Sequence, residues 1–352
     1  MIKGEDGEIL TDENKVIERW KTYFEDLLNR PEPDNPAEQA TFYGPELEIE
    51  APTRMDVKNA IKRLRNNKSP GIDNIPAEIW KYGGDILTDK MHDLITIIWR
   101  EEITPDRWEG GILVPLHKKG DKLVCSNYRG INLLVTAYKV LTIIIYEKMK
   151  PFAESIIGEY QAGFRRGRST TDQLFTIRQI IEKLWEYDKY QLHLFVDFKQ
   201  AYDSIHRSSM WNIMKEMGIP DKLIRVTQAC YRNTTCTVRF GKKMSTPIEI
   251  QTGLKQGCIL SPLLFNIMME KVARSITNRP EGIKFREVSI NCLGYADDVD
   301  IITSDVRDTE RITNIFRVNA ESIGLKINQE KTKIMEIARR YEMNGRVNID
   351  GI

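Results

Sequence analysis

Two adjacent carboxylates, Asp297 and Asp298, lie between two short apolar segments that are rich in valine and isoleucine. This pattern predicts a β-hairpin whose turn carries both acids. Like charges this close repel each other, and the pKa of one carboxyl should rise unless a cation lies between them. A third carboxylate, Asp197, lies near the end of residues 191–198, which have the pattern of a buried strand.

Three carboxylates would suit a divalent cation, because Mg²⁺ prefers hard oxygen ligands. Two such ions about 3.5–4 Å apart can activate a hydroxyl group for attack and stabilise a leaving pyrophosphate. Aspartate is also common in hairpin turns that have no chemical role. The acids alone therefore leave a two-metal site and an ordinary turn as open alternatives.

The elements that must position these acids follow from hydrophobic periodicity and turn signals. Helices are expected at residues 15–28, 53–64, 86–99, 131–147, 171–187, 261–276 and 308–322, and a linker with four prolines at 30–45. Strands are expected at residues 112–116, 191–198, 235–240, 246–251, 288–293, 299–303 and 333–337. This order predicts an α+β fold, in which a helical region is joined to a region with an antiparallel sheet.

The composition narrows the class of protein. The 352 residues are 41% hydrophobic and carry a net charge of +1. Residues 1–60 hold 7 Lys/Arg and 15 Asp/Glu, which gives −8 and leaves +9 for the remainder. A basic body fits an anionic partner such as nucleic acid, although ordinary solvated faces would give the same balance. No apolar run approaches the roughly 18 residues that span a bilayer. Five scattered cysteines without a CxxC motif favour a reduced intracellular protein.

Six motifs occur together in one order. They are NYRGI at 127–131, QAGFRRGRST at 161–170, FVDFKQAYD at 195–203, GLKQGCILSPLLFN at 253–266, YADD at 295–298 and GLKINQEKTK at 324–333. On these motifs, residues 66–333 resemble the reverse transcriptases of non-LTR retrotransposons. The resemblance is closest to LINE-type, RTE-like elements that also carry an upstream endonuclease.

The resemblance implies the fingers and palm of a right-hand polymerase, with the antiparallel sheet of the palm packed on helices. It implies an acidic helix and linker in residues 1–50, a fingers-type helical region in 51–190 and a palm in 191–340. Within the palm, a hairpin, a glycine loop and a long helix fall in 240–290. Residues 341–352 look like the start of a hairpin beyond the palm, so we expect a chain that stops before most of a thumb and lacks the endonuclease.

The resemblance also assigns roles around the carboxylates. Asp197 and Asp297 would bridge two Mg²⁺ ions, for which Mn²⁺ could substitute. Asp298 would support the site, and the carbonyl of Phe198 would help to hold one ion. Lys331 would either donate a proton to the leaving pyrophosphate or simply face water.

Further residues would contact the incoming nucleotide. Tyr202 stands where the family keeps an aromatic ring under the sugar, and such a ring would collide with a 2′-hydroxyl. The rest of the nucleotide would be bound by four residues: Lys118, Arg129, Gln256 and Gly257. Lys119 or Lys122 could take the place of Lys118.

Positive charge and an aromatic ring combine in Phe164, Arg165, Arg166 and Arg168. This combination suits the backbone and bases of a single-stranded template. A solvent-facing basic turn is the alternative.

The predicted function is RNA-directed DNA polymerase, which adds deoxynucleotides to the 3′-hydroxyl of a DNA primer on an RNA template. Two alternatives stay open: a weak or inactive nucleic-acid-binding remnant, and an RNA-templated RNA polymerase. The latter typically has a carboxylate where Tyr202 stands. The chain is expected to be intracellular without a membrane partner, and the family alone implies action in the nucleus. The oligomeric state stays open.

Overall fold

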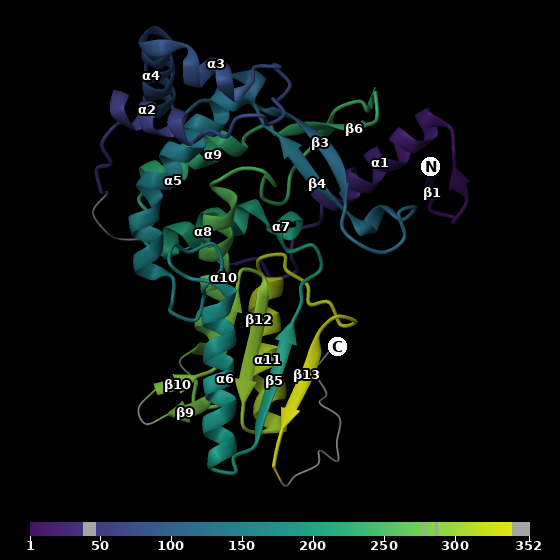
Figure 1. Ribbon diagram of the computed structural model, residues 1–352, viewed down its shortest axis with the longest axis vertical. Coiled ribbons are helices and arrows are strands. Elements are labelled where there is room, and N and C mark those ends of the chain that lie inside the picture. The colour runs from purple at the N-terminus through teal and green to yellow at the C-terminus, as the bar shows by residue number, and fades with distance from the viewer. Residues whose placement is uncertain (38–46, 278, 286–287, 340–352) are drawn as a thin grey trace. The chain divides into compact units, whose positions relative to one another are not determined.

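The computed structural model describes residues 1–37, 47–277, 279–285 and 288–339 (Figure 1). Contacts divide the chain into two compact units, each built from segments that are distant in sequence. The first unit comprises Met1–Pro31, Thr41–Phe152 and Gly218–Ser261. The second unit comprises Glu32–Ala40, Ala153–Met217 and Pro262–Ile352. This division does not follow the predicted boundaries at residues 50 and 190, so the division into fingers and palm stays a prediction.

The first unit combines helices with a mixed sheet. Its helices are α1 (Glu13–Leu28), α2 (Arg54–Arg63), α3 (Ala77–Tyr82), α4 (Gly84–Glu101), the short η1 (Asp106–Trp108) and η2 (Cys125–Asn127), most of α5 (Thr136–Ile156), and α9 (Asp221–Tyr231). Its strands are β1 (Ile2–Lys3), β2 (Ile9–Leu10), β3 (Gly110–His117), β4 (Tyr128–Leu133), β6 (Thr235–Phe240), β7 (Lys243–Met244) and β8 (Ile248–Glu249). β3 pairs antiparallel with β4 and parallel with β6, which also pairs with β7 and β8.

Helix α1 belongs to the core of this first unit. Its Trp20 and Phe24 are almost fully buried, and their rings stack with centroids 5.7 Å apart. They pack in one apolar cluster with Leu113 of β3 and Val238 of β6. Asp12 caps the helix by accepting hydrogen bonds from the first turn, as its position predicts. Helix α1 is therefore part of the first unit.

We expect Trp20→Ala to lower the free energy of unfolding by about 3–5 kcal/mol, because it leaves a large cavity between α1 and the sheet. Urea denaturation followed by far-ultraviolet circular dichroism measures this loss. Trp185→Ala provides the matched control, since Trp185 is 45% exposed. Equal losses for the two variants would contradict the assignment of α1 to the core.

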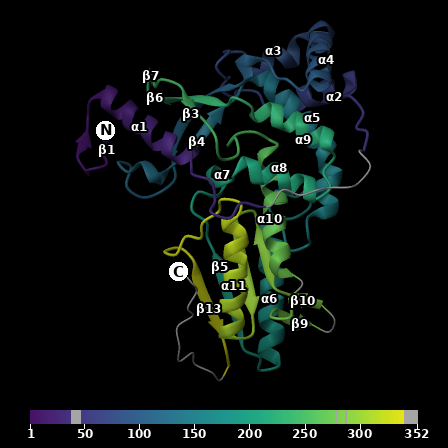
Figure 2. The same ribbon diagram turned by 180° about the vertical axis from the view of Figure 1, so that it is seen from behind.

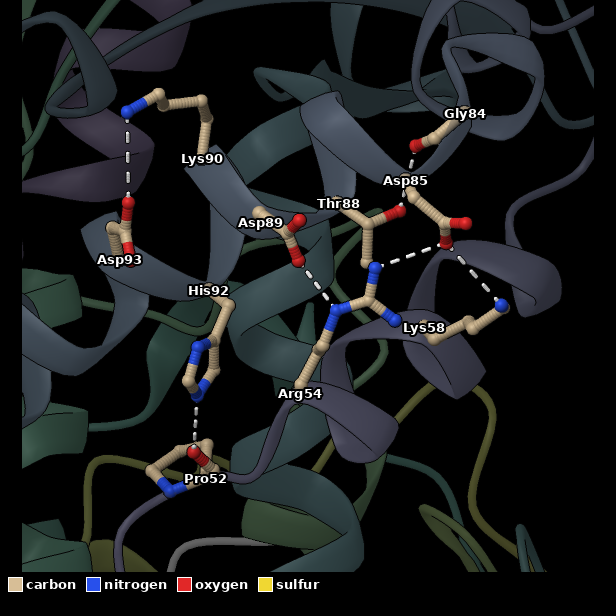
Figure 3. Close-up of polar contacts among 10 residues, drawn as sticks. All are labelled: Pro52, Arg54, Lys58, Gly84, Asp85, Thr88, Asp89, Lys90, His92 and Asp93. Atoms are coloured by element: carbon tan, nitrogen blue, oxygen red, sulfur yellow. Dashed lines mark hydrogen bonds and ion pairs between the residues drawn. The ribbon is translucent and has the colours of Figure 1, made fainter.

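Polar contacts join α2 to α4 on the surface of the first unit (Figure 3). Arg54 of α2 donates to Asp85 at 2.9 Å and also bonds Asp89, both on α4. Lys58 lies 3.5 Å from the same Asp85 carboxylate. These side chains are exposed, and exposed ion pairs add little stability, so we treat the cluster as surface structure.

The second unit carries the antiparallel sheet that the sequence predicts. Its helices are α6 (Thr170–Glu186), α7 (Ala201–Ser204), α8 (Arg207–Glu216), α10 (Ser261–Thr277) and α11 (Val306–Glu321). Its strands are β5 (Gln191–Val196), β9 (Ile283–Phe285), β10 (Val288–Ile290), β11 (Cys292–Tyr295), β12 (Asp298–Thr303) and β13 (Lys333–Ile337). The main sheet has the order β11-β12-β5-β13, and β9 pairs separately with β10.

Helices cover both faces of the main sheet. On one face, the hydroxyls of Thr303 in β12 and Thr309 in α11 are 2.5 Å apart, and Figure 2 shows α11 lying along the strands. The neighbouring Ile302 points to the opposite face, because side chains alternate along a strand. There it packs with Ile180 and Leu184 of α6. The sheet is thus the middle layer of three.

Several predicted elements need correction. Residues 131–147 were expected to form one helix, but Ile131–Leu133 belong to β4 and α5 begins at Thr136. Pairing with β3 overrides the apolar run that suggested a helix. The strand expected at 246–251 is only β8, because β6 first turns back into β7. Four helices, α3, α7, α8 and α9, were not expected. The hairpin start predicted at 341–352 lies outside the described residues.

Other sequence expectations can be compared directly. All five cysteines lie in described segments, where they are buried with free thiols. Within the described ranges, no helix is both long and apolar enough to cross a bilayer.

Candidate active site

The adjacent carboxylates lie at the turn of the β11–β12 hairpin. Tyr295 pairs with Asp298, so the turn itself consists of Ala296 and Asp297. Ala296 is buried and has a φ of +59°, in the left-handed region that a residue with a Cβ rarely adopts. The turn that carries the acids is therefore held in a conformation that needs support from its surroundings.

The sheet brings the third carboxylate to this turn. Val196, the last residue of β5, pairs with Val299 of β12. The adjoining residues, Asp197 and Asp298, therefore stand opposite each other where the two strands meet the turn. Burial, then Asp297 and Asp197, raise the pKa of Asp298 above its ordinary value of 3.8. Asp197 and the adjacent pair Asp297 and Asp298 thus share one electrostatic environment although about a hundred residues separate them along the chain.

Asp197 is engaged by the segment that precedes β13. Its Oδ2 accepts a hydrogen bond from Asn328 Nδ2 at 3.1 Å and lies 3.3 Å from Lys331 Nζ. The backbone N–H of Asn328 also donates to the carbonyl of Asp197 at 2.7 Å. The Lys331 side chain is 56% exposed and pairs with one of the predicted metal ligands, so its role stays a prediction.

The donor set suits a divalent cation by its chemistry, because it offers carboxylates whose mutual repulsion a cation would relieve. Two backbone hydrogen bonds flank Phe198. Asn328 N–H donates to the carbonyl of Asp197, and Lys199 N–H donates to the carbonyl of Lys326. Neither bond uses the carbonyl of Phe198. Among the described residues, however, no three His, Cys, Asp or Glu side chains are already arranged to hold a metal ion.

We expect Asp298 to make the metal-free protein less stable as the pH rises above the ordinary aspartate pKa of 3.8. Its raised pKa means that the folded chain binds the proton more tightly than the unfolded chain. This stabilisation is complete below the ordinary pKa and is lost as the pH rises through the raised pKa. Asp298→Asn should remove that part of the pH dependence, measured by urea unfolding in a chelating buffer.

The control for this measurement is Asp26→Asn, which makes the same change at an exposed position of α1. Its pH profile should match that of the wild-type chain. A wild-type profile for Asp298→Asn would contradict the expected contribution of Asp298.

Tyr202 lies beside the carboxylates in an aromatic stack. Its ring stacks on Phe265 of α10 with centroids 4.5 Å apart, and Phe164 meets it edge-on at 6.3 Å. Burial, and secondly Asp297, raise the pKa of its phenol. Within the described part of the chain, its hydroxyl has no hydrogen-bond partner. Packing thus fixes the ring close to Asp297.

The basic motif at 164–168 divides into an internal and an exposed part. The Arg165 side chain is only 8% exposed and pairs with Glu154 at 3.0 Å. Its guanidinium also donates to the carbonyls of Gly158 and Gln161. Phe164, Arg166 and Arg168 are exposed, and Arg168 pairs with Glu159. Arg165 is therefore a structural residue by its contacts, and the others are available at the surface.

The remaining predicted residues lie in the first unit. Arg129 is exposed on β4, and Lys118 is exposed in the loop that follows β3. The carbonyl of Gln256 accepts a hydrogen bond from Asn132 N–H at 2.9 Å. Gly257 has a φ of +114°, and a Cβ there would lie 2.7 Å from the carbonyl oxygen of Asn132. This close approach requires glycine at 257.

Three residues that support the motifs had no role in the sequence interpretation. Lys255 is buried, donates to the Cys230 carbonyl at 2.8 Å and lies 4.6 Å from the ring centroid of Tyr138. Asn328 holds Asp197, and Gln161 bonds the backbone of Ala296. Each stands inside a recognised motif, but neither residue type nor spacing revealed its contact.

Comparisons with known proteins bear on the same motifs. A family model described as "Reverse transcriptase (RNA-dependent DNA polymerase)" matches residues 116–345. The "Transposon TX1 uncharacterized 149 kDa protein" of Xenopus laevis is 25% identical over 93% of this chain. The "RNA-directed DNA polymerase from mobile element jockey" of Drosophila melanogaster is 22% identical over 94% of this chain. The chain spans 26% and 38% of the lengths of these two curated relatives.

Proposed function

The chain belongs to the reverse transcriptase (RNA-dependent DNA polymerase) family, and on this basis we propose that it extends a DNA primer on an RNA template. This is the family that the six motifs predicted. The observation that carries the proposal is the convergence of Asp197, Asp297 and Asp298 where β5 and the β11–β12 hairpin meet.

In the proposed reaction, the oxygen of the primer 3′-hydroxyl attacks the α-phosphorus of a deoxynucleoside triphosphate. A new P–O bond forms, the bond from the α-phosphorus to the β-phosphate oxygen breaks, and pyrophosphate leaves while the hydroxyl proton passes to solvent. Reverse transcriptases generally depend on divalent metal ions. Here two Mg²⁺ ions, or Mn²⁺ in their place, would supply Lewis-acid stabilisation of the attacking and leaving oxygens.

The residues of the second unit would divide this work. Asp197, Asp297 and the carbonyl of Phe198 would hold the ions, and Asp298 would support the site. The Lys331 ammonium, which lies 3.3 Å from Asp197, could donate a proton to the leaving pyrophosphate.

Four further residues are proposed to bind the nucleotide. The Arg129 guanidinium suits bidentate contact with phosphate oxygens, and the Lys118 ammonium acts as a point charge. Gln256 and Gly257 would approach the base and sugar. Their loop is fixed to β4, because Asn132 N–H donates a hydrogen bond to the carbonyl of Gln256.

For the template, we expect Arg166→Ala to weaken binding of single-stranded RNA and to lower the salt dependence of binding by about one counterion. Its free energy of unfolding should change by less than about 0.5 kcal/mol, because the residue is exposed. Arg165→Ala should instead lower that free energy by about 2–3 kcal/mol, since Glu154 and two carbonyls lose their donor.

Filter binding over a range of salt concentrations, together with urea denaturation, measures both properties. Phe164 and Arg168 are proposed to share the template contact with Arg166. If Arg165→Ala lowers the RNA salt dependence while Arg166→Ala does not, the division between internal and exposed arginines is wrong.

The test of the function is primer extension on an RNA template with Mg²⁺ and deoxynucleotides. We expect products that disappear when the metal is chelated. The alternative is a nucleic-acid-binding remnant without catalysis. RNA binding without detectable extension, even at high enzyme concentration with Mn²⁺, would favour that remnant and reject the polymerase.

The context of the chain is also proposed, from the family that its motifs resemble. We propose that it acts within a non-LTR retrotransposon, together with an endonuclease and a thumb encoded by the full element. Its partners would then be the RNA template, the DNA primer and deoxynucleoside triphosphates. Its place of action would be the nucleus.

A further inference from the structure

We propose that Gln161 is a positioning residue that clamps the turn carrying Asp297 in the geometry needed to bind a divalent cation. The catalytic consequence of this inference rests on the proposed function. Gln161 lies in the same motif as Arg165, Arg166 and Arg168. Its side-chain hydrogen bonds reach backbone groups and not the carboxylates. It acts through the backbone of Ala296, the residue immediately before Asp297.

The amide of Gln161 is fully buried and makes three hydrogen bonds. Its Oε1 accepts from the backbone N–H of Ala296 at 2.7 Å and from that of Gly163 at 2.8 Å. Its Nε2 donates to the carbonyl of Ala296 at 3.1 Å. The side chain therefore binds both the N–H and the carbonyl of one residue, which constrains φ and ψ there from both sides.

That residue is the one whose backbone needs support. Ala296 has a φ of +59°, in the left-handed region where a Cβ is unfavourable. Hairpin turns usually solve this problem with glycine or asparagine. Here alanine occupies the position, and the Gln161 amide supplies hydrogen bonds that an isolated hairpin would lack.

The clamp is held in place by a short parallel pairing along β11. Gly294 N–H donates to the carbonyl of Tyr160 at 2.8 Å, and Ala162 N–H donates to the carbonyl of Gly294 at 2.9 Å. Gly163 then passes so close to the turn that a Cβ would lie 2.1 Å from the nitrogen of Ala296. The Gln161 side chain thus continues the pairing at the point where the strand turns away.

The chain offers a matched control for this contact. Gln173 of α6 donates to the carbonyls of Tyr160 and Gly294 at 2.7 and 2.9 Å. It therefore supports the same backbone pairing without touching Ala296 in these bonds. Gln161→Met and Gln173→Met both replace an amide with an unbranched apolar chain of similar length, but only the first removes the clamp on the turn.

The experiment measures Mn²⁺ binding by electron paramagnetic resonance and amide hydrogen exchange across residues 293–299. We expect Gln161→Met to weaken Mn²⁺ binding roughly 10- to 100-fold, the usual effect of losing a group that orients metal ligands. Exchange at Ala296 should accelerate in this variant. Gln173→Met should keep Mn²⁺ affinity within about 3-fold of the wild-type chain, because the turn retains its clamp.

Two further variants keep the inference falsifiable. Gln161→Asn retains a buried amide but is one methylene shorter, so it should lose Mn²⁺ affinity even if Gln161→Met fails to fold. Ala296→Gly added to the Gln161 variant should recover part of the affinity, since glycine adopts the left-handed conformation without strain.

Wild-type Mn²⁺ affinity in both Gln161 variants, or equal losses in the Gln161 and Gln173 variants, would overturn the inference. So would a wild-type chain that binds no Mn²⁺. A wild-type chain that binds Mn²⁺ but extends no primer would reject the proposed function alone, because the comparison of Mn²⁺ binding and exchange would still decide the role of Gln161.

Discussion

Asp297→Asn is expected to lower the rate of primer extension by a factor on the order of 10³ or more, because a clamp on the developing charges is lost. Asparagine keeps the size of the side chain and removes its charge. Asp297 is part of the two-residue hairpin turn, and its carboxylate influences both Asp298 and the phenol of Tyr202. The loss should therefore appear in kcat, measured by single-nucleotide extension at saturating primer–template.

The control is Asp93→Asn, an equal change of charge on the exposed face of α4, where Asp93 pairs with Lys90. It should extend primers at the wild-type rate. Removing the negative charge at 297 should also reduce the repulsion felt by Asp298, so the folded protein should not be destabilised. Equal extension by Asp297→Asn and the wild-type chain would reject this site as the catalytic centre.

Much of the fold could be predicted where local signals suffice. The periodicity of residues 15–28 and 308–322 located α1 and α11 to within two residues at each end, and caps at Asp12 and Asp305 define their starts. Strand β4 could not be predicted in the same way. Ile131–Leu133 continue directly into the apolar start of α5, and only pairing with β3 makes them a strand.

The division into two units also lacks a local signal. Gly110 pairs in parallel with Thr235, which is more than a hundred residues away. Such pairings depend on the tertiary fold, so a contiguous division of the chain could not anticipate them. The same long-range pairing explains why the first unit contains a mixed sheet in a region predicted to be largely helical.

The same distinction between local signals and long-range contacts decides how much of the site could be predicted. The carboxylates at 197, 297 and 298 could be predicted because their residue type carries the chemistry. The separate roles of Arg165 and Arg166 could not, since composition does not say which guanidinium points inward to Glu154. Gln161 was passed over for a related reason: its function lies in hydrogen bonds to a backbone more than a hundred residues away.

Tyr202→Val is expected to raise the incorporation of ribonucleotides relative to deoxynucleotides by roughly 100-fold, because the bulk that would collide with a 2′-hydroxyl is removed. The ring is held firmly enough to exclude an atom, since it stacks on Phe265 and meets Phe164 edge-on. Single-nucleotide extension with each class of nucleotide measures the ratio of kcat/KM.

Tyr202→Phe separates the ring from its hydroxyl. The hydroxyl is buried and has no hydrogen-bond partner among the described residues, so its removal should leave sugar selectivity unchanged. If the valine variant keeps the wild-type preference, the ring does not read the sugar. If the wild-type chain itself prefers ribonucleotides, that result would support the alternative of an RNA-templated RNA polymerase. The aromatic residue at position 202 otherwise argues against this alternative. If sugar selectivity is lost in Tyr202→Val and kept in Tyr202→Phe, the bulk of the ring decides which nucleotide enters.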